Sequence, residues 1–148
     1  MPNLQPRTTP CGSCPYRRDC PSGIWDQSEY DKLKQYDAET FAQPPGVFMC
    51  HDKRDDVTLC RGWLDTHPKD QSLALRLAVS IGEAEEAIFD LPPSGVPVFE
   101  SGAAAAAHGM KGIRRPSVKA IKMISKLQRK IRVEKPPRKR RKNDKPPR

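Results

Sequence analysis

The stretch Cys11-Gly-Ser-Cys14-Pro-Tyr-Arg-Arg-Asp-Cys20, followed by Cys50-His51 and Cys60-Arg-Gly-Trp63, contains all five cysteines of the chain, and the last 88 residues have none. Two thiols separated by two residues can be aimed at one metal ion by a single tight turn. We therefore expect Cys11 and Cys14 to share a metal ion with Cys50 and Cys60. Such a site would hold in place the 35 residues between Cys14 and Cys50, which have few aliphatic side chains for a core of their own.

The residue types leave the metal open between zinc and iron. Structural zinc accepts four cysteines, or three cysteines and one histidine, in a closed tetrahedral shell. The expected ligands are Cys11, Cys14, Cys50 and Cys60, with Cys20, His51 and His67 as alternates. Four thiolates would also suit a [4Fe-4S] cluster, which is the alternative cofactor. Neighbours in a strand point to opposite faces, so Cys50 is expected to be the ligand and His51 to lie beside the site or in the core.

A disulfide framework explains the cysteines less well than a metal does. Their number is odd, and the first ten residues, MPNLQPRTTP, lack an apolar segment that would direct export. No stretch reaches the roughly 20 apolar residues of a membrane span. The expectation is a protein of the cytoplasm, or of the host cytoplasm if a phage encodes it, without a membrane span.

Charge divides the chain into an acidic and a basic part. Residues 1–110 have 10 Lys or Arg against 16 Asp or Glu, whereas residues 111–148 have 17 against 2. The second part is therefore expected to contact DNA or RNA by neutralising phosphates. The expected contacts are Lys119, Lys122, Lys126, Arg129, Lys130, Arg138, Lys139, Arg140, Arg141 and Lys142.

Local signals predict mostly helices. Asp26 with Glu29 resembles a capping box for a helix over 27–36, Ser101 and Ser117 are expected caps, and helices are also expected at 72–79 and 83–90. The alanine-rich helix is expected to end at Gly109, and Val47–Cys50 is expected to be a short strand that faces Cys60 across a hairpin. In the last helix, Val118, Ile121, Ile124, Leu127 and Ile131 form the expected apolar stripe.

These signals together predict a small α+β, mostly α, metal-stabilised domain with a basic helix and a basic tail. The expected organisation is an extended arm over 1–10, a cysteine-rich domain over 11–110, a basic amphipathic helix over 111–133 and a disordered tail over 134–148.

The order of motifs resembles an uncharacterised family of small proteins from actinobacteria and their phages. The matching segments are PCGSCPYRRDCPSGIWDQSEYDKLKQYD, FMCH, CRGWL, LALRLA and VPVFESGAAAAAHGM with a C-terminal helix, over roughly residues 10–130. The resemblance implies metal ligands at Cys11, Cys14, Cys50 and Cys60 and no established activity. Cys20 departs from the family pattern.

A shorter segment is similar to the WhiB-like transcription factors, which hold a [4Fe-4S] cluster and dock on a sigma factor. Here Cys11-x2-Cys14-x5-Cys20 is followed by Gly23-Ile24-Trp25. The chain has no cysteine before Cys11 and no paired glycine after Trp25, where those factors have both. This resemblance implies a redox-responsive regulator of transcription.

The expected function is therefore a zinc-stabilised binding or regulatory protein that acts on nucleic acid or on a nucleoprotein machine. A protein partner such as RNA polymerase or a sigma factor is expected beside the DNA or RNA. Catalysis is not expected, because Pro10-Cys11-Gly-Ser-Cys14 matches only half of the zinc deaminase signature and no His-x-Glu precedes it. A zinc-dependent enzyme stays the third hypothesis, since an open position on the metal would activate water.

Overall fold

The computed structural model describes residues 3–134 of the chain, which form a small, helix-rich domain with a two-stranded parallel sheet. The α-helices are α1 (Gln27–Gln35), α2 (Arg61–Thr66), α3 (Leu73–Ser80), α4 (Gly102–Met110) and α5 (Val118–Glu134). The strands are β1 (Gln5–Pro6) and β2 (Thr58–Leu59), and the 3-10 helices are η1 (Thr40–Ala42), η2 (Lys69–Gln71) and η3 (Glu86–Asp90). The predicted fold class is thus confirmed at the level of a small, mostly α domain.

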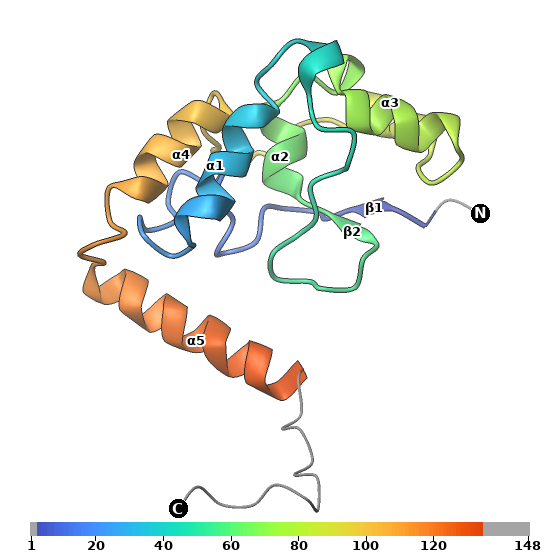
Figure 1. The fold of residues 1–148 in the computed structure, drawn as a ribbon. Coiled ribbons are helices and arrows are strands. Elements are labelled where there is room, and N and C mark those ends of the chain that lie inside the picture. The colour runs from blue at the N-terminus through green and yellow to red at the C-terminus, as the bar shows by residue number, and fades with distance from the viewer. Residues whose placement is uncertain (1–2, 135–148) are drawn as a thin grey trace, which may run out of the picture.

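Helices α1 and α4 pack side by side and form the main helix pair of the domain (Figure 1). Tyr30 and Leu33 are the buried residues of α1. Gly109 lies inside the last turn of α4 and does not end the helix, contrary to the prediction. A Cβ at this position would overlap the ring of Tyr30, so the glycine permits the close packing of the two helices.

Aromatic rings fill the core between these helices and α2. Trp63 and Tyr16 are almost completely buried, and Tyr36 lies edge-to-face against both Phe48 and Trp63, with ring centroids 5.8 Å and 5.4 Å apart. Edge-to-face contacts of this kind stabilise a core beyond the area that they bury.

The segment before β2 forms one antiparallel bridge instead of the predicted strand. Met49 is bridged to Leu59, and Cys60 donates its backbone N–H to the carbonyl oxygen of Phe48 at 2.9 Å. The other edge of β2 is taken by β1, where Gln5 pairs with Thr58 and Pro6 with Leu59 in parallel. Because β1 occupies this edge, the beginning of the described chain is part of the domain.

Helix caps account for several boundaries. Ser72, Ser101 and Ser117 each accept a backbone N–H with their side-chain oxygen, which confirms the predicted starts at 101 and 117. Asp26 makes no side-chain cap, so the predicted capping box was wrong. Helical structure within the predicted 83–90 segment is limited to the 3-10 helix η3.

Helix α5 lies beneath the rest of the domain (Figure 1), and only part of the predicted apolar stripe, Ile124 and Leu127, belongs to the face that packs on Cys20 and Ile24. Ala120 is fully buried against Cys20 and Ile24, and Met123, Ile124 and Leu127 complete this cluster. Val118 and Ile121 are 70% and 51% exposed, so they do not belong to the docked face. The prediction gave weight to large aliphatic residues, whereas the close contact with Cys20 requires the small Ala120. No helix of the described part is both long and apolar enough to span a membrane.

Candidate metal centre

Two loops and the start of α2 deliver the four expected ligands. Cys11 and Cys14 come from one turn, closed by a hydrogen bond from the Cys14 N–H to the Cys11 carbonyl oxygen at 3.0 Å. Cys50 donates its N–H to the Thr58 carbonyl oxygen at 2.9 Å, and Cys60 precedes the first residue of α2. The bridge between the segments of Cys50 and Cys60 therefore holds these two cysteines near each other.

The four thiols are buried and contact one another in pairs. Cys14 Sγ lies 3.7 Å from Cys60 Sγ, and the Cys11 thiol interacts with those of Cys14 and Cys50. Each of the four is at most 5% exposed. Two sulfurs bound to one zinc at about 2.3 Å in a tetrahedral shell lie about 3.8 Å apart, close to the Cys14–Cys60 separation, which is also that of two thiols in van der Waals contact.

The thiols do not converge as a complete set of ligands. Within residues 3–134, no three His, Cys, Asp or Glu side chains form a group that could hold a metal ion. Coordination of one ion would therefore require the two outer thiols, those of Cys50 and Cys60, to turn toward a common centre between the pairs.

Mutual contact and burial raise the pKa of three of these thiols, those of Cys11, Cys14 and Cys50. The hydrogen bond with Cys14 and burial raise the pKa of Cys11, although the contact with Cys50 lowers it. For Cys14, the hydrogen bond with Cys11 lowers the pKa, but the contact with Cys60 and burial lift it well above its usual value. Contact with Cys11 and burial raise the pKa of Cys50. A divalent cation would lower the pKa values of these thiols, because a thiol that coordinates a metal ion is deprotonated.

Backbone N–H groups are nevertheless aimed at three of the sulfurs. The N–H of Tyr16 hydrogen-bonds to Cys14 and lowers its pKa, and the N–H groups of Asp52 and Lys53 do the same for Cys50. Trp63 donates its N–H to Cys60 Sγ at 3.4 Å. Donors placed two or three residues after a cysteine stabilise a thiolate, which is the form that binds a metal.

Gly62 lets α2 approach the thiols, a role that the sequence reasoning did not identify. A Cβ at position 62 would lie 2.5 Å from Cys14 Sγ and 2.7 Å from Tyr16 Cβ. Both distances are far below van der Waals contact, so a side chain at this position is incompatible with the observed packing. In the sequence, only the position of this glycine between Cys60 and Trp63 pointed to its role.

The alternate ligands lie elsewhere. Cys20 is buried against α5. Burial, together with the charges of Cys11 and Asp19, raises its pKa to about 12. His67 Nε2 lies 3.2 Å from Tyr16 Oη, and its Nδ1 lies 3.6 Å from Asp37 Oδ1. Both ring nitrogens of His67 therefore have partners other than a thiol.

The imidazole of His51 lies between the ring of Trp25 and the carboxylate of Glu29. Its Nε2 is 3.1 Å from Glu29 Oε2, and its ring centroid is 4.5 Å from that of Trp25. Hydrogen bonding with His51, and further with Lys32, lowers the pKa of Glu29 to about 2, although burial opposes the shift. Since an ionised carboxylate only accepts hydrogen bonds, Nε2 of His51 carries a proton. Its Nδ1 is buried and has no hydrogen-bond partner in the described part.

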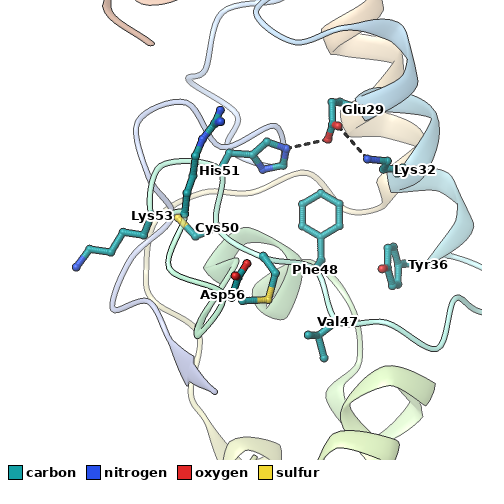
Figure 2. Close-up of a pocket in the computed structure, with 11 residues that line it drawn as sticks. Glu29, Lys32, Tyr36, Val47, Phe48, Cys50, His51, Lys53 and Asp56 are labelled. Atoms are coloured by element: carbon teal, nitrogen blue, oxygen red, sulfur yellow. Dashed lines mark hydrogen bonds and ion pairs between the residues drawn. The ribbon is translucent and has the colours of Figure 1, made fainter. Parts of the chain in front are cut away.

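A cavity of about 470 Å³ separates α1 from residues 47–56 next to this histidine. Figure 2 shows the Phe48 ring between His51 on one side and Tyr36 on the other, with Glu29 joined by dashed lines to His51 and Lys32. Lys53, Arg54 and Asp56 also line it. Asp56 has a positive φ of 58°, a conformation that Asp tolerates better than most residues, so the loop turns sharply here.

The expected nucleic-acid contacts on α5 are exposed. Lys119, Lys122, Lys126, Arg129 and Lys130 lie on the part of the helix that turns away from Ala120. Lys130 forms an ion pair with Asp52, which also pairs with Arg7 at 3.4 Å. Asp52 follows Cys50 and His51, so α5 is tied to the loop of the candidate metal centre. The remaining expected contacts, Arg138, Lys139, Arg140, Arg141 and Lys142, and the predicted disordered tail lie outside the described residues.

The buried pair Arg61 and Asp65 in α2 is a second feature without a sequence signal. Their side chains are 6% and 4% exposed, and Arg61 Nε donates to Asp65 Oδ1 at 3.0 Å. Arg61 also donates to the carbonyl oxygens of Arg7, Thr8 and Pro92, and Asp65 accepts from Ser94. The pair thus connects the first residues of the domain with the loop after η3.

A family model matches residues 6–126 of the chain, and its description is a family of unknown function, DUF6283. The chain belongs to this family. The match covers the thiols, the core and the first half of α5, which is consistent with the predicted small uncharacterised family. No curated protein and no solved structure matches the chain.

Proposed function

We propose that Cys11, Cys14, Cys50 and Cys60 bind one structural zinc ion in a small nucleic-acid-binding protein. The observation that carries the proposal is the burial of four thiols in pairwise contact, with 3.7 Å between Cys14 Sγ and Cys60 Sγ. Four thiolates would close the zinc shell and leave no position for a reactive water. The zinc would therefore serve the fold, and the proposal is a binding protein and not an enzyme.

The same separation favours zinc over a [4Fe-4S] cluster. Each cysteine of such a cluster binds a different iron, so the sulfurs lie farther apart than those that share one ion. The position of Cys20 beneath α5 also weakens the similarity to the WhiB-like pattern, which uses the cysteine at this spacing as a ligand.

Matched cysteine variants test the zinc site. We expect Cys14→Ser to lose zinc and to unfold at a lower temperature, since a structural zinc contributes its binding energy to folding. Cys20→Ser is the control, because Cys20 is equally buried but lies outside the four thiols, and it should keep one zinc per chain. Zinc content of the purified variants, measured by plasma mass spectrometry, decides the matter. Loss of zinc from both variants, or from neither, would contradict the assignment of ligands.

The exposed cations of α5 support nucleic acid as the partner. They project from one helix that is fixed to an otherwise acidic domain, and each contacted phosphate would release a counterion. Replacing Lys119, Lys122 and Lys126 by Gln should weaken binding to a labelled oligonucleotide and reduce the slope of log Kd against log salt concentration by about 2–3. An unchanged slope would show that α5 does not contact phosphates.

We further propose a role in transcription beside RNA polymerase or a sigma factor, in the cytoplasm of a bacterium or of a phage host.

A further inference from the structure

The cavity beside His51 has the composition of a site for a flat, polar ring. Its volume of about 470 Å³ lies within the roughly 300–1,000 Å³ of small-ligand sites. Val47, Phe48, Met49 and Tyr36 supply apolar walls, and Figure 2 shows the Phe48 ring at its centre. Trp25 lies behind His51 and packs on its ring, which holds the imidazole in place.

One residue that lines the cavity, His51, has a ring nitrogen without a hydrogen-bond partner in the described residues. Glu29 holds the proton of His51 on Nε2, and Lys32 donates to the same carboxylate at 2.9 Å. The other ring nitrogen, Nδ1, is buried and has no hydrogen-bond partner within residues 3–134. A ligand that reaches this nitrogen can satisfy it with a hydrogen-bond donor or an acceptor.

The lining of the cavity has three cations, Lys32, Lys53 and Arg54, against the two carboxylates of Glu29 and Asp56. Lys53 and Arg54 are exposed, and within the described residues no carboxylate lies within ion-pair distance of either. Arg54 and His51 adjoin Leu127 and Ile131 of α5, where Lys130 pairs with Asp52. A chain of phosphates on the basic side of α5 could therefore extend to Lys53 and Arg54.

We propose that this cavity receives one unstacked base of a single-stranded nucleic acid whose backbone lies on α5. The inference rests on the proposed nucleic-acid function and specifies its ligand. Every base has both a donor and an acceptor on its Watson–Crick edge that could pair with His51 Nδ1, and a flat face that suits Phe48 and Val47. A base within an intact duplex exposes neither, so the cavity selects single strands. DNA and RNA share this chemistry.

Filling the cavity tests the inference. Val47→Trp places an indole in the space of the base, and Ile81→Trp, on the far helix α3 where Ile81 is 67% exposed, is the matched control. Fluorescence anisotropy would compare a labelled single-stranded 12-mer, as DNA and as RNA, with the corresponding duplexes. We expect Val47→Trp to weaken single-strand binding about tenfold, the usual effect of one lost base contact, and to leave duplex binding unchanged. Ile81→Trp should alter neither.

A second variant and a second signal keep the test decisive if Val47→Trp does not fold. Lys53→Gln combined with Arg54→Gln changes two exposed side chains and should also weaken single-strand binding more than duplex binding. In the wild type, the single strand should change the fluorescence of Trp25, because that ring packs on His51, and Trp25→Phe should abolish the change. Equal affinity for both forms, unaffected by the cavity variants, would overturn this inference alone. Absence of binding to any oligonucleotide would overturn the proposed function as well.

Discussion

Gly62 shows how a single residue without a side chain can decide whether the thiols meet. Its Cα lies so close to Cys14 and Tyr16 that any Cβ would overlap both. The spacing of cysteines predicted which thiols come together, because a C-x2-C turn is a local structure. It could not predict Gly62, since the residue that it must accommodate lies 48 positions earlier in the chain.

Gly62→Ala should therefore destabilise the protein by about 1–3 kcal/mol, the usual cost of overpacking a core. Gly12→Ala is the control, because a Cβ at position 12, between Cys11 and Cys14, would have no atom within 4 Å. Urea denaturation followed by circular dichroism measures both. Equal stability of the two variants would show that α2 does not pack on Cys14 as described.

The carboxylate of Glu29 should make the stability of the protein depend on pH. Its pKa is lowered from 4.5 to about 2, chiefly by the hydrogen bond with His51. A lowered pKa in the folded state contributes stability above the unfolded value of 4.5, and this contribution is lost as the pH falls toward 2. The difference in unfolding free energy between wild type and Glu29→Gln should therefore be largest above pH 5 and shrink between pH 4.5 and 2. A difference that is constant across this range would exclude the ion pair.

At the scale of elements, the helices with a serine cap were predictable, and α1 was also predicted correctly although its expected cap is absent. Ser101 and Ser117 begin α4 and α5 as expected, because a serine cap needs only its own backbone. Helix α2 was missed, since it begins at Cys60, whose sulfur accepts the N–H of Trp63 in place of an oxygen. The sheet was missed because each strand has two residues, and its pairing joins positions more than 50 residues apart.

Substitutions on α5 distinguish the observed packing from the apolar stripe that the sequence predicts. Ala120 is fully buried against Cys20, whereas Ile121 is 51% exposed. Ala120→Lys would bury an ammonium group, so it should release α5 and expose Cys20 to alkylation. Ile121→Lys should leave Cys20 protected. Peptide mass spectrometry after brief iodoacetamide treatment identifies the modified cysteine, and the reverse result would restore the stripe predicted from the sequence.

In the whole molecule, a few buried polar groups hold distant segments together where the apolar core is small. Arg61 and Asp65 connect α2 with residues 7–8 and with residues 92–94, two segments far apart in the sequence. Charge pattern predicted the acidic domain and its basic helix. It could not predict this pair, because an arginine and an aspartate four residues apart usually lie on a solvated helix face.

Arg61→Ala should cost about 3–5 kcal/mol, because it leaves the Asp65 carboxylate buried without its cation. Lys34→Ala removes an exposed pair with Asp31 and should change the stability by less than about 1 kcal/mol. Thermal unfolding of both variants, at equal zinc content, gives the comparison. A loss for Arg61→Ala no larger than that for Lys34→Ala would mean that the network does not hold the domain together.

The four thiols are the centre of the whole account, since they connect the first turn, the loop of Cys50 and the start of α2. X-ray absorption spectroscopy of the purified, full-length protein tests them most directly, because it identifies the metal and counts its ligands. We predict one zinc per chain with four sulfur neighbours at about 2.3 Å. Iron in place of zinc, a shell of nitrogen and oxygen, or a folded protein without metal would contradict it.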